Sequence, residues 1–202
     1  LKIEPSCMLH PNIKEAYNSK KEKAIEQPNL KVVSQLETDV QTNYAQQTIT
    51  TVDGEQFLKN TRLHQEVFGP FSMIIQCKDA SQLQEIIAKL EGQLTGTLIA
   101  NNDEEAARYS GIIDALQNRV GRLIYNGVPT GVEVCPSMTH GGPYPASTDS
   151  RFTAVGIHSI KRWVRPFSFQ DWPNHLLPNE LKNENPLGIS RLVNNKQTTA
   201  RI

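Results

Sequence analysis

Hydrophobic and polar residues are patterned most clearly between residues 71 and 126, where three apolar runs stand apart from one another. The first two runs, Phe71 to Cys77 and Leu94 to Ala100, have the length and composition of buried strands. The third run, Gly121 to Asn126, is of the same kind and ends in a residue that favours turns. The pattern therefore predicts three strands in this part of the chain.

Two amphipathic helices are predicted between these runs. Asp79, followed three positions later by Gln82, is a helix-start signal, and Gly92 marks the end of the same helix. Asn102 opens the second helix in a similar way. Apolar residues recur at helical spacing in both segments, namely Leu83, Ile86, Ile87 and Leu90, then Tyr109, Ile112, Ile113, Leu116 and Val120. Strands alternating with helices predict an α/β fold, with helices covering a right-handed parallel sheet.

The segments on either side of this unit are less regular. Asn12 to Gln27 reads as a helix that ends before Pro28, and Leu30 to Val33 and Gln47 to Val52 read as strands. Residues 35–45 show no pattern, and no structure is assigned to them.

Glycine and proline interrupt the chain after Gly127. A long irregular segment such as residues 127–152 is functional or disordered, and its place after a parallel strand favours function, because ligands bind at the carboxyl ends of such strands. Phe152 to Phe169 is strand-like, and Asp171 to Ile202 reads as an extended arm.

Charge and composition exclude several classes of partner. Lys plus Arg and Asp plus Glu number 21 each, and a balanced chain is not expected to bind nucleic acid. No apolar run is long enough to cross a bilayer, so no membrane partner is expected. The cysteines Cys7, Cys77 and Cys135 are odd in number and widely spaced, which favours reduced thiols and a cytoplasmic location.

The segment Glu66-Val67-Phe68-Gly69-Pro70-Phe71 carries the strongest chemical signal. The Glu66 carboxylate offers two oxygens that can accept hydrogen bonds from both hydroxyls of a ribose, and the Phe68 ring can lie against a flat heterocycle. On spacing alone, a surface glutamate beside a core phenylalanine remains the alternative.

The cysteines and histidines allow two further interpretations. Cys135 and His140 lie five residues apart on the irregular segment, where a thiol nucleophile and its base would make the protein a thiol hydrolase. Cys7 and His10 could join them as four zinc ligands, but the spacing fits no common zinc module, so no metal is expected. Cys77 is expected in the core.

Four passages resemble the C-terminal portion of the aldehyde dehydrogenase superfamily, and most closely the branch that oxidises 2-oxoglutarate semialdehyde (2,5-dioxovalerate). The Glu-x-Phe-Gly-Pro motif is superfamily-wide, whereas the passage from His140 to Phe152, together with Trp163-Val164-Arg165-Pro166, is specific to the branch. The passages run in the family's order: Met8 to Ile13, Glu66 to Phe71, Gly121 to Gly131 with Asn126, and His140 to Phe152.

The resemblance implies an enzyme that oxidises an aldehyde to a carboxylic acid with NADP, or with NAD. A cysteine thiolate attacks the carbonyl, and water activated by a glutamate releases the acid. Glu66 and Phe68 match the family's contacts to the nicotinamide ribose. His140, Gly141 and Phe152 stand where the family builds part of its substrate entrance.

The resemblance also implies that this chain holds no catalytic residue. The family's nucleophile lies in a Gly-Gln-x-Cys context and its base in Glu-Leu-Gly-Gly, and neither occurs here. Residues 1–152 are therefore expected to be part of a catalytic domain, 153–170 an oligomerisation strand that makes a homo-oligomer, and 171–202 a C-terminal arm. The chain alone should be inactive. A non-catalytic assembly module is the alternative.

Overall fold

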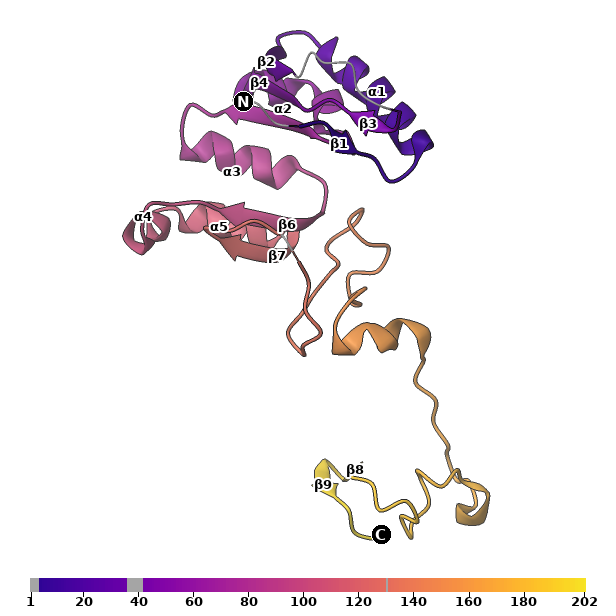
Figure 1. The fold of residues 1–202 in the computed structure, drawn as a ribbon. Helices are drawn as coiled ribbons and strands as arrows, with labels where there is room; N and C mark the ends of the chain where they lie inside the picture. Colours follow the sequence, from indigo (N-terminus) through magenta and orange to yellow (C-terminus); the bar gives the residue numbers. More distant parts are fainter. Residues whose placement is uncertain (1–3, 36–41, 130) are drawn as a thin grey trace. The chain divides into compact units, whose positions relative to one another are not determined.

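The computed structural model describes residues 4–35, 42–129 and 131–202 (Figure 1). The chain divides into two compact units, Leu1–Arg162 and Trp163–Ile202.

The first sheet of the larger unit has β4 at its centre. Strand β4 pairs antiparallel with β2 on one side and parallel with β5 on the other. The short strands β1 and β3 pair antiparallel beside it. The elements of this region are β1 (Ser6–Cys7), α1 (Pro11–Ile25), β2 (Lys31–Gln35), β3 (Tyr44–Ala45), β4 (Thr48–Asp53), α2 (Gly54–Lys59), the 3-10 helix η1 (Thr61–His64) and β5 (Phe71–Gln76).

Two apolar clusters hold this region together. One consists of Val52, Phe57, Leu63 and Ile86, so it joins β4 to α2, η1 and the next helix. The other, formed by Met8, Tyr17 and Ala45, ties α1 to the short β1–β3 pair, with Val67 and Phe71 packed against it. The Glu66 to Phe71 segment therefore packs against the second cluster through Val67 and Phe71.

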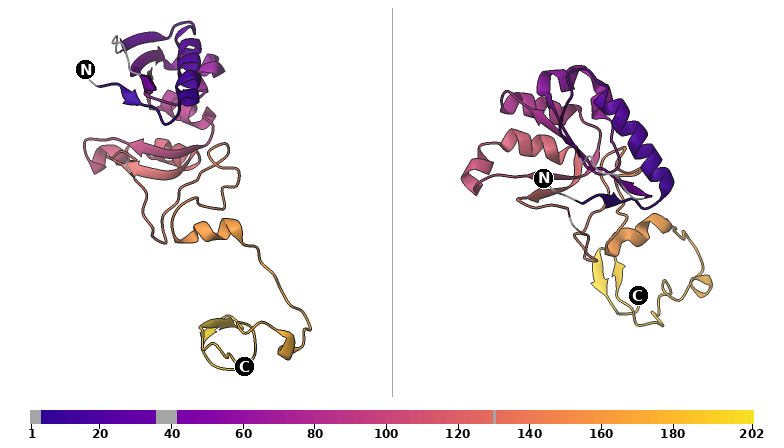
Figure 2. Two further views of the ribbon diagram at one scale, coloured as in Figure 1. Left: turned by 45° about the vertical axis from the view of Figure 1, so that its right-hand side comes forward. Right: turned by 45° about the horizontal axis from the view of Figure 1, so that its top comes forward.

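The second sheet consists of β6 and β7, which run parallel (Figure 2). The helices between the strands begin at the predicted signals: the Asp79 side chain accepts a hydrogen bond from the Gln82 N–H, and Asn102 accepts from Glu105 N–H, each at 2.8 Å. The second predicted helix is broken at Tyr109. The elements here are α3 (Ala80–Lys89), β6 (Gln93–Leu98), α4 (Asp103–Ala107), α5 (Ser110–Gln117) and β7 (Val120–Tyr125).

The α/β class and its parallel strand pairs are confirmed, but the predicted strand neighbours are partly wrong. The apolar run from Phe71 pairs with β4, not with β6, so the three predicted strands fall in two separate sheets. Side-chain periodicity reports which face of a strand is buried, and it carries no information about which strand lies alongside. Helix α3 packs against both α2 and α5 and so connects the two sheets.

The strand expected within residues 153–170 is not found in this structure. Ile157–Trp163 forms the 3-10 helix η2, and residues 164–169 form no strand. A strand requires a hydrogen-bonded neighbour, and among the described residues none makes a backbone hydrogen bond to 164–172. The oligomerisation role of this segment stays a prediction.

The smaller unit is more folded than the predicted extended arm. Asn194 and Asn195 both have positive φ and make the two-residue turn between β8 and β9. The buried Asn185 side chain donates to the carbonyls of Ile189 and Thr199, which fixes the chain around the hairpin. The elements are η3 (Asn174–Leu176), β8 (Arg191–Val193) and β9 (Lys196–Thr198). Within the described ranges of both units, no helix is long and apolar enough to span a membrane.

Candidate functional site

The Glu66 to Phe68 segment joins η1 to β5 and belongs to no helix or strand. Val67 packs against the apolar cluster of Met8, Tyr17 and Ala45. Glu66 and Phe68 are not part of that cluster and are both exposed, Phe68 to 60%. Val67 thus anchors the segment to the core, while the two predicted ligand contacts on either side of it remain accessible.

Tyr17 of α1 holds the turn that follows. Its hydroxyl donates to the carbonyls of Gln46 at 2.6 Å and Pro70 at 3.3 Å. Burial raises the pKa of the Tyr17 phenol, so the hydroxyl stays protonated and remains a donor. The ring lies directly against Gly69, whose φ is +152°. The Gly-Pro turn is thereby fixed from a residue about fifty positions earlier in the chain.

Glu66 and Phe68 line one wall of a cavity of about 650 Å³. The N-terminal segment contributes further lining residues, so two of the passages that resemble the aldehyde dehydrogenases meet at this cavity. The lining residues are Cys7, Met8, Leu9, Ile13, Glu66, Val67, Phe68, Gly69 and Phe71.

The two predicted contacts are free to bind a ligand. The Glu66 carboxylate makes no hydrogen bond or ion pair with any described residue, and only its backbone carbonyl is engaged, by Lys20 at 3.4 Å. An unpaired carboxylate can accept two hydroxyl hydrogens, and the exposed Phe68 ring can stack on a planar group. The donor and acceptor set of these side chains therefore fits a nicotinamide riboside.

The three residues predicted at the substrate entrance come together around a second cavity, of about 400 Å³. His140, Gly141 and Phe152 all line it, and so does Arg162. The Thr153 hydroxyl joins the two ends of the loop, because it accepts from His140 N–H at 2.8 Å and donates to the Val155 carbonyl at 2.7 Å. Glu66 and Phe68 do not line this cavity.

This loop lies at the opposite end of the strands from the one that its sequence position predicts. The Gly92 N–H, just before β6, donates to the Tyr144 carbonyl at 3.1 Å. A side chain at Gly121, at the start of β7, would collide with the backbone of Gly141. The chain thus returns from the carboxyl end of β7 to the amino ends of β6 and β7, so the expectation of a site at the carboxyl ends is wrong for this loop.

The cysteine chemistry considered from sequence is not supported. The Cys135 thiol lies 3.5 Å from the Ser137 hydroxyl and, among the described residues, makes no hydrogen bond with His140. Burial, followed by the negative charge of Asp79, raises the pKa of the Cys77 thiol, which packs against the core as predicted. Across residues 4–35, 42–129 and 131–202, no group of three or more His, Cys, Asp or Glu side chains is placed to hold a metal ion.

Asn126 has a structural role at the end of β7. Its side-chain amide accepts from the Ala100 N–H and donates to the Ala100 carbonyl, both at 2.8 Å, while its own φ is +47°. These two bonds join the ends of β6 and β7 and leave the amide occupied, so a turn-forming asparagine is the better interpretation.

Sequence reasoning missed the residues that complete the two cavities. Cys7 and Leu9 line the same cavity as Glu66 and Phe68, and Arg162 lines the same cavity as His140. Only the resemblance of Met8 to Ile13 to a family passage marked the first group, and nothing in the sequence linked Arg162 to His140. Contacts between segments this far apart in the chain are not encoded in local spacing.

The chain has close sequence relatives among curated proteins. It is 39% identical to alpha-ketoglutaric semialdehyde dehydrogenase 2 of Azospirillum brasilense over 192 residues, which is 94% of this chain and 36% of that protein. It is 37% identical to alpha-ketoglutaric semialdehyde dehydrogenase of Acinetobacter baylyi, again over 94% of this chain and 36% of the relative. The chain thus spans about a third of the length of the curated relatives that it matches. No family model matches it.

Solved structures of dehydrogenases share the fold of this chain over part of their length. Lactaldehyde dehydrogenase from Escherichia coli superposes with a TM-score of 0.57 at 19% identity, over 79% of this chain and 31% of that one. Delta-pyrroline-5-carboxylate dehydrogenase from Mycobacterium tuberculosis also gives 0.57, at 18% identity, over 85% of this chain and 32% of that one. Sequence relatives and structural neighbours agree, and the chain has the aldehyde dehydrogenase fold over the stretch that it shares with them.

Proposed function

We propose that this chain is the C-terminal part of an NAD(P)-dependent dehydrogenase that oxidises 2-oxoglutarate semialdehyde to the dicarboxylic acid. The observation that carries the proposal is the identity of 37–39% over 94% of the chain to two proteins named as alpha-ketoglutaric semialdehyde dehydrogenases. NADP is the proposed cofactor, by resemblance to the same branch, and the cytoplasm the proposed location.

Glu66 and Phe68 are the proposed contacts to the nicotinamide riboside. The unpaired Glu66 carboxylate would accept hydrogen bonds from the ribose hydroxyls, and the 60% exposed Phe68 ring would lie against the nicotinamide. When bound, the cofactor supplies the acceptor for the hydride of the aldehyde carbon. One neighbour, 1-pyrroline-5-carboxylate dehydrogenase from Thermus, was solved with bound NAD and has a TM-score of 0.57.

His140, Gly141 and Phe152 are the proposed substrate entrance. Their cavity of about 400 Å³ has the size of a small-molecule site, and backbone packing against β6 and β7 keeps the loop in place. The polar His140 and Thr148 and the apolar Phe152 would admit a short chain that carries a carboxylate.

The remaining machinery is proposed to come from polypeptide that this chain does not contain. Gly-Gln-x-Cys and Glu-Leu-Gly-Gly are absent from the sequence. Strand β5 pairs on one side only among the described residues, and Ile74 on it is 50% exposed, which is unusual for a parallel strand. Such an edge and face are suited to further strands of the same protein. Homo-oligomerisation through residues 153–170 is proposed as well, by resemblance.

An activity assay tests the proposal. The 202 residues alone should not reduce NADP with 2-oxoglutarate semialdehyde, because they lack the nucleophile and the base. The complete reading frame that contains them should reduce it, and Glu66→Gln in that protein should raise the cofactor KM by about tenfold, since one acceptor charge is lost. Glu91→Gln, a change of the same chemistry on an exposed residue outside both cavities, is the matched control.

Two results would contradict the proposal. Steady NADP reduction by the homogeneous 202-residue chain would show that the machinery is complete without further polypeptide. Kinetics of the Glu66→Gln enzyme equal to those of Glu91→Gln would remove Glu66 from the cofactor site.

A further inference from the structure

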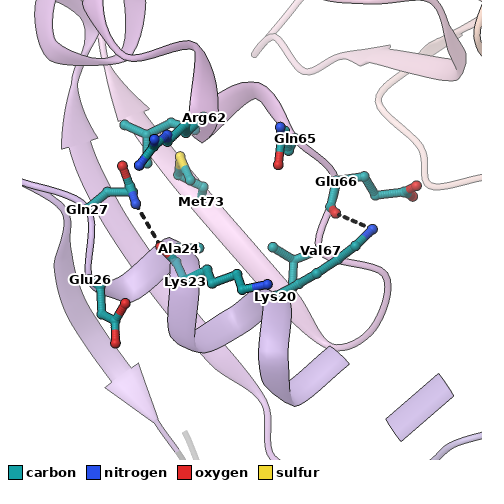
Figure 3. Close-up of a pocket in the computed structure, with 11 residues that line it drawn as sticks. Lys20, Lys23, Ala24, Glu26, Gln27, Arg62, Gln65, Glu66, Val67 and Met73 are labelled. Atoms are coloured by element: carbon teal, nitrogen blue, oxygen red, sulfur yellow. Dashed lines mark hydrogen bonds between the residues drawn. The ribbon is translucent and has the colours of Figure 1, made fainter. Parts of the chain in front are cut away.

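A third cavity, of about 390 Å³, lies between α1 and the segment that leads into Glu66 (Figure 3). Basic side chains approach it from both walls, Lys20 and Lys23 from α1 and Arg62 from η1. Its floor is apolar. The lining residues are Lys20, Lys23, Ala24, Glu26, Gln27, Arg62, Leu63, Gln65, Glu66, Val67 and Met73.

The cations in this cavity are not neutralised by the protein. Neither the Lys23 ammonium nor the Arg62 guanidinium makes a hydrogen bond or ion pair with any described residue. Three ion pairs form among the described residues, Lys59 with Glu55, Lys89 with Glu85 and Arg151 with Asp149, and none of them involves Lys23 or Arg62. Both of these cations, which line the cavity, therefore remain available to an anionic ligand.

The two carboxylates that line the cavity point elsewhere. In Figure 3 the side chains of Glu26 and Glu66 run to opposite sides of the view, away from Lys23 and Arg62. Lys20 is held at the rim, where its ammonium donates to the Glu66 carbonyl at 3.4 Å. The Gln65 side chain also has no partner among the described residues, so its amide is a free donor.

We propose that this cavity binds a small dianion that carries phosphate or carboxylate groups. The Arg62 guanidinium offers a planar fork for two oxygens, Lys23 a point charge, and the Gln65 amide a neutral donor. The apolar floor of Met73 and Val67 keeps water away from one side of the ligand and strengthens these bonds. Binding at this site needs neither cofactor nor aldehyde, and the cavity adjoins the proposed cofactor site, with which it shares the lining residues Glu66 and Val67.

Nuclear magnetic resonance titration of the ¹⁵N-labelled 202-residue chain tests the proposal. Inorganic phosphate is added at pH 7.5, with sodium chloride adjusted to hold ionic strength constant, and succinate is the second probe. Binding should give saturable shifts confined to the amides around Lys23, Arg62 and Gln65. Saturation by phosphate alone identifies a phosphate ligand, and saturation by succinate alone identifies a dicarboxylate.

Variants distinguish a specific anion-binding site from nonspecific electrostatic attraction of anions. Arg62→Met and Lys23→Met should each raise the dissociation constant by about five- to tenfold, because each removes one charge-assisted contact. Lys31→Met is the matched control, an exposed lysine on β2 outside the cavity, and should change it less than about twofold. Shifts that do not saturate with either probe, or equal affinities for Arg62→Met and Lys31→Met, would overturn the proposal.

Discussion

At the scale of single residues, Gly69 is the position where the candidate cofactor site is least tolerant of change. Its φ of +152° is rare for residues with a side chain, and an added Cβ would lie within 2.9 Å of Tyr17 Cγ. Gly69→Ala should therefore lower the free energy of unfolding by about 1–3 kcal/mol. Gly131→Ala is the control, because its Cβ would meet nothing within 4 Å. Urea denaturation measures both, and equal midpoints would contradict the assigned packing of Tyr17.

Asp149, which lines the second cavity, should make the stability of its loop depend on pH. Hydrogen bonds from the Arg151 guanidinium and backbone N–H lower the pKa of the Asp149 carboxyl from 3.8 to about 2. A lowered pKa means that the paired, ionised form stabilises the folded loop above pH 4, and that this contribution is lost as the pH falls through about 2. Carboxyl ¹³C shifts of Asp149 should titrate near 2, and Arg151→Gln should return the midpoint towards 3.8. A midpoint near 3.8 in the unaltered chain would rule out the pair.

At the scale of elements, local signals located the strands and helices well and their neighbours poorly. Asp79 and Asn102 were recognisable as helix starts because capping depends on residues three positions apart. The pairing of β5 with β4 was not recognisable, because it depends on a residue-to-residue register between distant segments. The same holds for the candidate site: the alternation of Glu66 and Phe68 is local, whereas the support from Tyr17 is not.

Asn126 allows the joint between β6 and β7 to be tested. Asn126→Ala removes both hydrogen bonds to Ala100 and places alanine at a φ of +47°, so the free energy of unfolding should fall by about 1–3 kcal/mol. Asn118→Ala, which removes one bond to the Asp114 carbonyl at an ordinary helical φ of −82°, should cost less. Thermal denaturation followed by circular dichroism compares the two, and a larger loss for Asn118→Ala would contradict the assigned role of Asn126.

At the scale of the whole molecule, the sequence suggested three parts and the structure has two compact units. The boundary at Arg162 was not predictable from composition, because the residues on both sides of it read as one strand-like run. The compactness of the smaller unit depends on the buried Asn185 and on contacts of the Arg191 guanidinium with the carbonyls of Lys182 and Ala200. Hydrogen bonds from side chains to the backbone produce no hydrophobic periodicity in the sequence, so the fold of this unit could not be predicted from such a pattern.

The first ten residues of the smaller unit, 163–172, are where a protease is expected to cut first. Residues 164–172 are exposed and make no backbone hydrogen bond with any other described residue, so the chain can enter a protease active site without unfolding. Chymotrypsin at low dose should therefore cleave at Trp163, Phe167 or Trp172, which are at least half exposed, before it reaches the buried Phe57. Mass spectrometry of the early products should find fragments that end or begin within 163–172. First cuts inside Leu1–Arg162 would instead mean that the larger unit opens more easily than the segment that follows it.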